Sequence, residues 1–464
     1  MSTSFLTIAE ASERIAAGTL TSEQLTRDCL DRIAALNETL HAFVLVREDE
    51  AMAAARAADA EISAGRRIGP LHGIPMGIKD IVETAGVRTT GQSALFLDRV
   101  PERSAHLWER LEAAGAILIG KTTTWEFAIG GTAHDLPFPP ARNPWDPSRE
   151  TGGSSSGSAA AVAAGLCSGA IGTDTGGSVR VPAAWCGIAG LKPTYGLVGR
   201  SGVYPLSHTL DHPGPMCWSS EDCALMMEVL AGDDPRDAST RAAPALSFIR
   251  RVKEGVAGLR IGVWDAMTDH IQTDPEVADA MSRGIDALRE AGAEVRSVTL
   301  PPLKEIDAVC NLISRSESFA YHRVNLEEQP EKYGFESRAR LLAGSIIGAA
   351  EYIEAQRVRT LIISAFEDAF EDFDLIVCEM TGSVAPPHGD ATTYTRLGSR
   401  AGNVTGLPAH SVCTGFDAQG LPMAMQIIGP AFADAVLLAA GHVVEQACGA
   451  RQTRALSRPR KELA

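Results

Sequence analysis

Two Gly-Gly-Ser turns are the parts of this sequence best suited to chemistry, and they place Ser154 and Ser178 twenty-four positions apart. Paired glycines before a serine let the backbone adopt conformations closed to other residues and leave amide N–H groups unobstructed. Between the turns, small residues including Ala159 to Ala164 predict a short helix and allow the turns to approach closely. Serine hydroxyls and unobstructed amides could form either a nucleophilic site or an anion-binding site. Three interpretations of these two turns are compared below.

Lys79 is a third residue of interest, because it lies in a mainly apolar run that predicts an interior strand from Ile74 to Val82. A buried lysine is costly unless it is neutral or has a partner. Taken alone, Lys79 could equally be a surface lysine, and Ser154 could merely cap the helix that begins near Ser156.

The first interpretation, a phosphate-binding loop, fails because neither turn ends in the Gly-Lys-Ser/Thr that reaches phosphates and Mg²⁺. The second takes residues 153–157 as a Gly-x-Ser-x-Gly nucleophile elbow around Ser155, completed by an Asp and a His. An elbow requires a strand immediately before the serine, whereas residues 143–147 predict turn and loop. The histidines that could complete such a triad include His208, His212 and His410, and the sequence around them does not single out any one as catalytic.

The third interpretation uses both turns and Lys79 together, and at these residues the chain resembles the amidase signature family. Members of that family have a Gly-Gly-Ser-Ser turn, a Gly-Gly-Ser-(Ile/Val)-Arg turn, and a Cys-Gly-x-x-Gly-Leu-Lys-Pro-Thr run, here Cys186 to Thr194. Further matches between Ser22 and Glu445 are residues 120–122, 126–127, 143–145, 403–409, 420–422, 426 and 429. The resemblance implies an α/β fold, one compact domain with a twisted mixed sheet of about eleven strands flanked by helices.

The resemblance also assigns roles to residues. It implies that neutral Lys79 draws a proton through Ser154 from Ser178, whose Oγ attacks the substrate carbonyl, and that the peptide bond before Ser154 is cis. It implies an oxyanion hole formed by the backbone N–H groups of Thr175, Gly176, Gly177 and Ser178. Asp174 and Arg180 flank this turn and are expected to pair and hold it.

The implied activity is that of an amidase, which cleaves C–N bonds of small amides, with aryl esters or carbamates (urethanes) as further substrates, through an acyl-enzyme on Ser178. By position, the residues that resemble the family's acyl-pocket loop are Ile129, Gly130 and Gly131. The chain departs from common family patterns, where substrate contact is expected, at Pro139, Cys378-Glu379-Met380, His410 and Cys413.

An alternative of a different class is the glutaminase subunit of a tRNA-dependent amidotransferase. The usual Tyr-Asp-Gly-x-x-Tyr-Gly segment of those subunits is missing here, and residues 315–323 resemble a stand-alone amidase instead. We therefore expect the substrate to be a small molecule of the amide type. If the chain forms an oligomer, we expect a homodimer.

The elements that must position these residues alternate between helix and strand, which predicts the same α/β architecture. A helix from Glu102 to Ala114 is followed by a strand from Ala116 to Ile119. The same order recurs in strand 258–264, helix 275–291, strand 294–300, helix 349–370 and strand 375–378. We expect one amidase domain over residues 1–455 and a basic C-terminal tail over 456–464.

Composition excludes several other classes of protein. The formal net charge of −16 opposes nucleic-acid binding, because phosphate neutralisation needs clustered Lys and Arg. No apolar run approaches the roughly 18 to 20 residues that span a bilayer. The nine cysteines are scattered without Cys-x-x-Cys pairs, so we expect neither a zinc site nor any other metal or cofactor. The N-terminus lacks the features of a secretory signal, which predicts a cytoplasmic protein.

Overall fold

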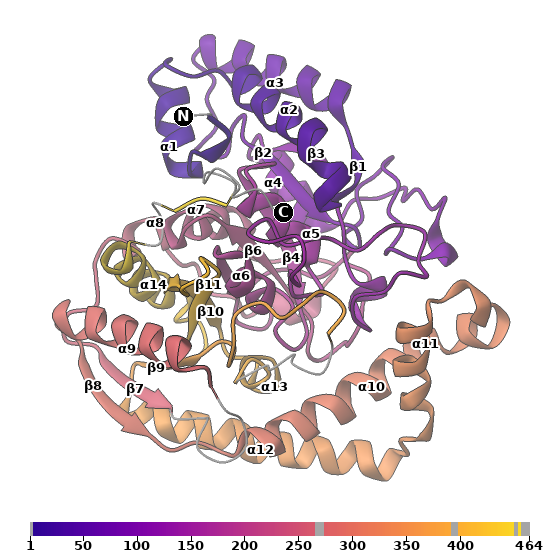
Figure 1. Cartoon of the computed structure of the whole chain (residues 1–464), viewed down its shortest axis with the longest axis vertical. Helices are drawn as coiled ribbons and strands as arrows, with labels where there is room; N and C mark the ends of the chain where they lie inside the picture. Colours follow the sequence, from indigo (N-terminus) through magenta and orange to yellow (C-terminus); the bar gives the residue numbers. More distant parts are fainter. Residues whose placement is uncertain (1–2, 265–272, 391–397, 450–452, 456–464) are drawn as a thin grey trace.

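The structure is a computed structural model, and it describes residues 3–264, 273–390, 398–449 and 453–455. Within these residues, eleven strands form one mixed sheet and fourteen α-helices surround it (Figure 1). The predicted α/β fold with a mixed sheet of about eleven strands is therefore confirmed. The predicted C-terminal tail, 456–464, lies outside the described residues.

The sheet has the strand order β1-β3-β2-β4-β6-β5-β10-β11-β9-β7-β8. Its strands are β1 (Phe43–Val46), β2 (Pro75–Lys79), β3 (Ile117–Thr122), β4 (Gly169–Asp174), β5 (Ala189–Lys192), β6 (His212–Cys217), β7 (Arg260–Trp264), β8 (Glu294–Val298), β9 (Leu375–Glu379), β10 (Ala409–Phe416) and β11 (Pro422–Ile428). The pairs of β2 with β3 and β4, and of β7 with β8 and β9, are parallel. The other pairs are antiparallel.

The helices precede, connect and follow these strands. They are α1 (Ile8–Ala16), α2 (Ser22–Leu40), α3 (Glu48–Ser63), α4 (His106–Ala113), α5 (Ser156–Ala163), α6 (Arg180–Cys186), α7 (Ser220–Leu230), α8 (Phe248–Arg251), α9 (Pro275–Glu290), α10 (Leu303–Glu328), α11 (Phe335–Leu342), α12 (Ala349–Asp372), α13 (Ala401–Thr405) and α14 (Asp434–Cys448). Short 3-10 turns are η1 (Thr3–Phe5), η2 (Ala94–Phe96), η3 (Glu126–Ala128), η4 (Ala238–Thr240), η5 (Pro330–Lys332) and η6 (Ala343–Ile346).

Helices cover both faces of the sheet, because successive side chains of a strand point to opposite faces. On β3, Leu118 packs with α1, α4 and α7, whereas its neighbours Ile117 and Ile119 pack with α2, α3 and α5. On β9, Ile376 packs with α10, α12 and α13, whereas Val377 packs with α9 and α14. The central strands are thus apolar on both sides, as expected for a sheet between helical layers.

The elements predicted from the sequence are present with shifted ends. The helix expected over 102–114 is α4, and it begins only at His106 because the preceding residue, Ala105, is held by a backbone hydrogen bond to Glu83. The strand expected over 74–82 is β2, and it ends at Lys79, whose carbonyl accepts hydrogen bonds from the amides of Ile81 and Val82 in a turn. That turn leaves Lys79 at the carboxyl end of an interior strand.

Helices α10 and α12 form a long antiparallel pair along one side of the molecule, and α11 lies at one end of this pair (Figure 1). None of the described helices is long and apolar enough to cross a membrane. The nine cysteines form no disulfide bond, and eight of them are buried.

Candidate active site

Lys79 is fully buried at the end of β2, between β3 and β4. Its Nζ lies 2.8 Å from Ser154 Oγ and 2.8 Å from Thr173 Oγ1. The sequence-based prediction of a buried lysine on an interior strand is therefore confirmed, and its two partners are hydroxyl groups.

Burial lowers the pKa of Lys79 to about 7, because the ammonium form loses its hydration, although the carboxylates of Asp174 and Asp211 oppose this shift. The amine is therefore substantially neutral near pH 7. A neutral amine has a lone pair that can accept the proton of a neighbouring hydroxyl.

Ser154 lies in the loop before α5, follows a cis peptide bond from Gly153, and is fully buried. Its side chain does not cap the helix, since the N-cap residue is Ser155 and no side-chain capping bond is present. The backbone amide of Trp125 donates to the Ser154 carbonyl at 3.1 Å and fixes the loop.

The nucleophile elbow finds no support around Ser155. No strand lies immediately before this residue, and its side chain is fully buried, with Oγ 3.2 Å from both the amide nitrogen and the carbonyl oxygen of Thr173. His410 is within hydrogen-bond distance of Ser220, and His212 of the Leu210 carbonyl. These contacts give the side chains of Ser155, His212 and His410 structural partners.

Ser178 differs from Ser154 and Lys79 in that it reaches a cavity. Its side chain lies in the turn between β4 and α6, it is 7% exposed, and it lines a cavity of about 90 Å³. The carbonyl of Ser178 accepts a hydrogen bond from the amide of Ser155 at 3.2 Å, which ties the two Gly-Gly-Ser turns together. The turns that the sequence singled out are thus adjacent in space.

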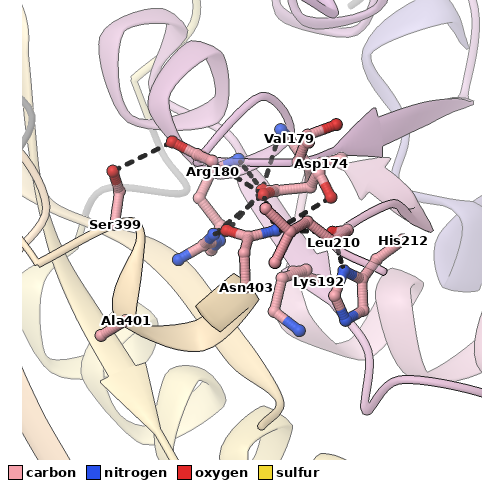
Figure 2. A network of polar contacts seen from close by, with 12 residues as sticks. Asp174, Val179, Arg180, Lys192, Leu210, His212, Ser399, Ala401 and Asn403 are labelled. Atoms are coloured by element: carbon pink, nitrogen blue, oxygen red, sulfur yellow. Dashed lines mark hydrogen bonds and ion pairs between the residues drawn. The ribbon is translucent and has the colours of Figure 1, made fainter. Parts of the chain in front are cut away.

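A buried ion pair holds the second turn, as the sequence predicted. Arg180 donates to both carboxylate oxygens of Asp174, at 2.9 and 3.0 Å, and both residues are fully buried (Figure 2). Asn403 donates to the carbonyl and to the carboxylate of Asp174, both at 2.9 Å. Burial alone would raise the pKa of Asp174, but the charge and hydrogen bonds of the Arg180 guanidinium, followed by the charge of Lys192, hold it well below its usual range.

Asp174 also orders the backbone of the turn itself. Its carboxylate accepts the amide N–H of Gly177 at 2.7 Å and that of Val179 at 3.1 Å. Of the four amides predicted to face an oxyanion, the Gly177 amide is therefore already used by Asp174. The amides of Thr175, Gly176 and Ser178 remain the candidates for the oxyanion hole.

The cavity at Ser178 is bounded by segments far apart in the sequence. Its described lining residues are Trp125, Ala128, Ile129, Gly130, Thr175, Gly176, Ser178, Leu206, Cys310, Asn311, Ser314, Arg315, Arg340 and Arg400. Of the predicted pocket loop, Ile129 and Gly130 line this cavity, whereas Gly131 lines a smaller neighbouring one. The departures from family patterns at Pro139, Glu379, His410 and Cys413 are not among the described lining residues.

Glu126 connects this wall of the cavity to α11. Its buried carboxylate accepts the amide of Gly334 at 2.9 Å and the hydroxyl of Ser337. The sequence alone indicates no role for Glu126 or α11, because only long-range contacts bring them to the site.

A larger cavity of about 240 Å³ lies next to the first and shares Ala128 and Leu206 with it. It is lined by Thr173 and Asp211 instead of Ser178, so it approaches the Lys79 side of the site. In the described residues, no group of three or more His, Cys, Asp or Glu side chains could hold a metal ion.

Comparisons with known proteins agree with the fold and with the motifs. The family model described as Amidase matches residues 24–438. A curated relative, the A subunit of the glutamyl-tRNA(Gln) amidotransferase of Roseiflexus sp. strain RS-1, is 41% identical over 95% of this chain and 96% of its own.

Solved structures match nearly the whole chain as well. One was reported as a vestigial protein complex that reveals the evolutionary origins of an s-triazine catabolic enzyme, with an inhibitor bound. It has a TM-score of 0.90 and 31% identity over 98% of this chain and 100% of its own. The native peptide amidase of Stenotrophomonas maltophilia has a TM-score of 0.84 and 31% identity over 97% of both chains.

Proposed function

Because this chain belongs to the amidase signature family and is an amidase-type enzyme acting on C–N bonds, we propose that it hydrolyses a carboxamide through an acyl-enzyme on Ser178, as the glutaminase subunit of an amidotransferase. The observation that carries the hydrolytic step is the contact of buried Lys79 with Ser154, beside the turn that carries Ser178.

In the proposed first step, a proton moves from Ser178 to Ser154 while Ser154 passes its own proton to the lone pair of Lys79. Ser178 Oγ then attacks the carbonyl carbon of the amide, and the C–O bond forms as the carbonyl oxygen becomes an oxyanion. Thr173 accepts an N–H of Lys79 at 2.8 Å and so directs the lone pair toward Ser154.

The oxyanion is stabilised by backbone amides of the Thr175–Ser178 turn, with Gly177 excluded because its N–H donates to Asp174. Ser154 then returns the proton to the departing nitrogen, the C–N bond breaks, and ammonia leaves from a primary amide. Water, activated by the same relay, attacks the acyl-enzyme and releases the acid. Apart from this water, the proton transfers use the side chains of Ser178, Ser154 and Lys79.

The proposed role as a glutaminase subunit rests on sequence similarity over nearly the whole chain. Curated relatives named for the A subunit of glutamyl-tRNA(Gln) amidotransferase are 37 to 41% identical over 91 to 97% of the chain. This similarity outweighs the missing Tyr-Asp-Gly-x-x-Tyr-Gly segment, which by itself favours a stand-alone amidase. We accordingly propose glutamine as the amide donor, further subunits as partners, and the cytoplasm as the location, since the named relatives act on a glutamyl-tRNA.

The experiment is amidation of glutamyl-tRNA(Gln) by the purified chain, combined with the remaining subunits of the amidotransferase from its own organism. We expect glutaminyl-tRNA to form with glutamine as nitrogen donor, and no product when the chain carries Ser178→Ala. Failure to amidate, together with amide hydrolysis by the chain alone, would reject the amidotransferase role and keep the hydrolytic one.

A second candidate function is a stand-alone amidase acting on small amides, aryl esters or carbamates. It is favoured by the structural match to a peptide amidase at the same 31% identity as the s-triazine-related complex. The glutaminase subunit and the stand-alone amidase would share this fold and these catalytic residues. The two proposed functions are therefore distinguished only by measuring whether the single chain hydrolyses amides without other subunits.

A further inference from the structure

One buried carboxylate, that of Asp211, holds two parts of the wall of the cavity at Ser178. Its Oδ1 accepts the hydroxyl hydrogen of Thr175, and its Oδ2 accepts the backbone amides of Leu206 at 2.8 Å and Ser207 at 2.9 Å. Thr175 and Leu206 both line that cavity, although they come from different segments of the chain. Asp211 therefore joins the turn that carries Ser178 to the loop of residues 206–211, which precedes β6.

Asp174 and Asp211 hold different parts of the turn that carries the nucleophile. Asp174 accepts the amides of Gly177 and Val179, in the second half of the turn. Thr175, at the start of the turn, is held through its side chain by Asp211. The amide of Thr175 is a candidate donor of the oxyanion hole, so a contact that fixes this residue also fixes that donor.

The loop that carries Asp211 is itself fastened to the helix pair α10 and α12. Glu317, on α10, accepts the hydroxyl of Ser207, and it accepts the hydroxyl of Thr209 at 2.8 Å and its amide at 3.0 Å. The same carboxylate accepts the hydroxyl of Tyr352, on α12, at 2.8 Å. These bonds give Asp211 a fixed position beside the turn.

The buried charge of Asp211 lacks a direct counter-ion. No Lys or Arg side chain of the described residues lies within ion-pair distance of it, and an uncharged asparagine would cost less to bury. Burial raises the pKa of Asp211, whereas its hydrogen bonds and the more distant Arg200 oppose this shift. A charge retained at such a cost can act on another group.

The group on which this charge acts is Lys79. The carboxylates of Asp174, on β4, and of Asp211 both favour the ammonium form of Lys79 and so raise its pKa against the effect of burial. His212, next to Asp211, is neutral near pH 7, because burial holds its pKa well below its usual range. Asp211 thus bears on the proposed base as well as on the oxyanion turn.

We propose that Asp211 is a positioning residue for hydrolysis at Ser178, which acts through its hydrogen bond to Thr175 and through its charge near Lys79. The inference rests on the proposed hydrolysis and is independent of whether the chain works alone or in a complex. Its two parts are separable by experiment. The hydrogen bond should affect kcat, because oxyanion donors act in the transition state, and the charge should affect the pH at which Lys79 loses its proton.

Thr175→Val tests the hydrogen bond, because it removes the hydroxyl and keeps the branched shape. We expect kcat to fall about tenfold for the amide that the wild type hydrolyses best, the effect of one hydrogen bond, with KM nearly unchanged. The acid limb of the pH–rate profile should stay in place, since the charge of Asp211 remains. Thr175→Ser keeps the hydroxyl and should restore the wild-type kcat. A wild-type kcat in Thr175→Val would overturn the inference.

Asp211→Asn tests the charge, because it removes the charge with little change in shape. The ammonium form of Lys79 is then less favoured, so the acid limb should move to lower pH. A merely structural loss would lower the rate and leave the limb where it is, and that result would overturn the inference. If circular dichroism shows that Asp211→Asn does not fold, Thr175→Val and its rescue by Thr175→Ser decide.

Asp434 and Thr194 provide a matched control pair. The Thr194 hydroxyl donates to the buried Asp434 carboxylate at 2.6 Å and the Thr194 amide does so at 2.8 Å, but neither residue is among the described lining residues of the cavities. Thr194→Val and Asp434→Asn should keep the wild-type kcat and the wild-type limb. The same losses and shifts in this pair would overturn the inference, because they would reflect a general loss of packing.

Labelling of Ser178 by phenylmethylsulfonyl fluoride gives a readout that needs no substrate. The Oγ–S bond forms as the S–F bond breaks, fluoride leaves, and the serine proton passes to the base, so the rate measured by mass spectrometry should follow the same limb. Labelling of the wild type with a limb that moves in Asp211→Asn, but no hydrolysis of any amide tested, would support the inference and count against the proposed substrate alone. Wild-type behaviour of Asp211→Asn and Thr175→Val would overturn the inference and leave the hydrolysis intact. A wild type that is neither labelled at Ser178 nor active on amides would reject the proposed hydrolysis and the inference with it.

Discussion

Lys79 Nζ lies 2.8 Å from Ser154 Oγ, and both side chains are fully buried. Ser178 lines the cavity, whereas neither of these two residues is among the described lining residues. A base that is shielded from bulk water keeps its perturbed pKa and passes its proton only along the hydroxyls next to it. This arrangement predicts that substitutions of Ser178, Thr173 and Lys79 change the reaction rate and its pH dependence in different ways.

Ser178→Ala should lower kcat by about 10⁴ to 10⁶, since a nucleophile is lost, with no change in fold. Ser155→Ala is the matched control, because the Ser155 hydroxyl bonds the Thr173 backbone and serves the fold. We expect Ser155→Ala to lower stability and to retain most of the turnover. Rates with one amide and circular dichroism spectra of both variants check this, and the reverse pattern would restore the nucleophile elbow.

Thr173→Val should lower kcat/KM about tenfold, because the amine of Lys79 loses a hydrogen-bond partner that orients it. Since a hydroxyl oxygen stabilises the ammonium form, its removal should also lower the pKa of Lys79 further. The acid limb of the pH–rate profile should then move to lower pH. Thr173→Ser, which keeps the hydroxyl, should leave the limb in place, and a limb that stays fixed in Thr173→Val would contradict a contact between these residues during turnover.

Much of the catalytic geometry could be predicted because it is encoded locally. The glycine pairs before Ser154 and Ser178 and the apolar run around Lys79 each predict a backbone conformation or burial from neighbouring residues. The alternation of helices and strands likewise predicts the layers of the fold. What the sequence could not show is where β2 ends, at Lys79, because that depends on a turn that forms after it.

The lining of the cavity at Ser178 could not be predicted from the sequence, for a different reason. Arg315, Arg340 and Arg400 are separated by many residues and meet only through the packing of α10, α11 and α13 around one cavity. Gly131, chosen by its position in the sequence, lines the neighbouring cavity and not this one. Thr173 was also missed, because a threonine in a buried strand has no local signal that distinguishes a lysine partner from a packing residue.

Asp174→Asn should destabilise the fold by about 3 to 5 kcal/mol, the cost of leaving a buried charge without its partner. The change removes the carboxylate that pairs with Arg180 and accepts the Gly177 amide. Glu48→Gln is the control, because its pair with Arg27 is exposed and should contribute about 0 to 1 kcal/mol. Urea unfolding measures both, and similar midpoints for the two variants would refute a structural role for the buried pair.

The last prediction concerns the protonation of Lys79, whose pKa is lowered by burial to about 7. Only the neutral amine can accept a proton from Ser154, and the neutral fraction grows as pH rises through that pKa. We therefore expect kcat/KM to rise with pH along a limb centred near 7 and to level off above it.

Lys79→Met should abolish the limb and most of the rate while the protein stays folded, because an apolar side chain of similar length removes a costly buried amine. Lys79→Arg should do no better, since guanidinium stays protonated and is not a base. Amides should lose more rate than activated esters, whose leaving group needs less protonation. The measurement is a pH–rate series for wild type and both variants with one amide and its matched ester. A limb near pH 7 that persists in Lys79→Met would belong to another group and would remove Lys79 from the proton relay.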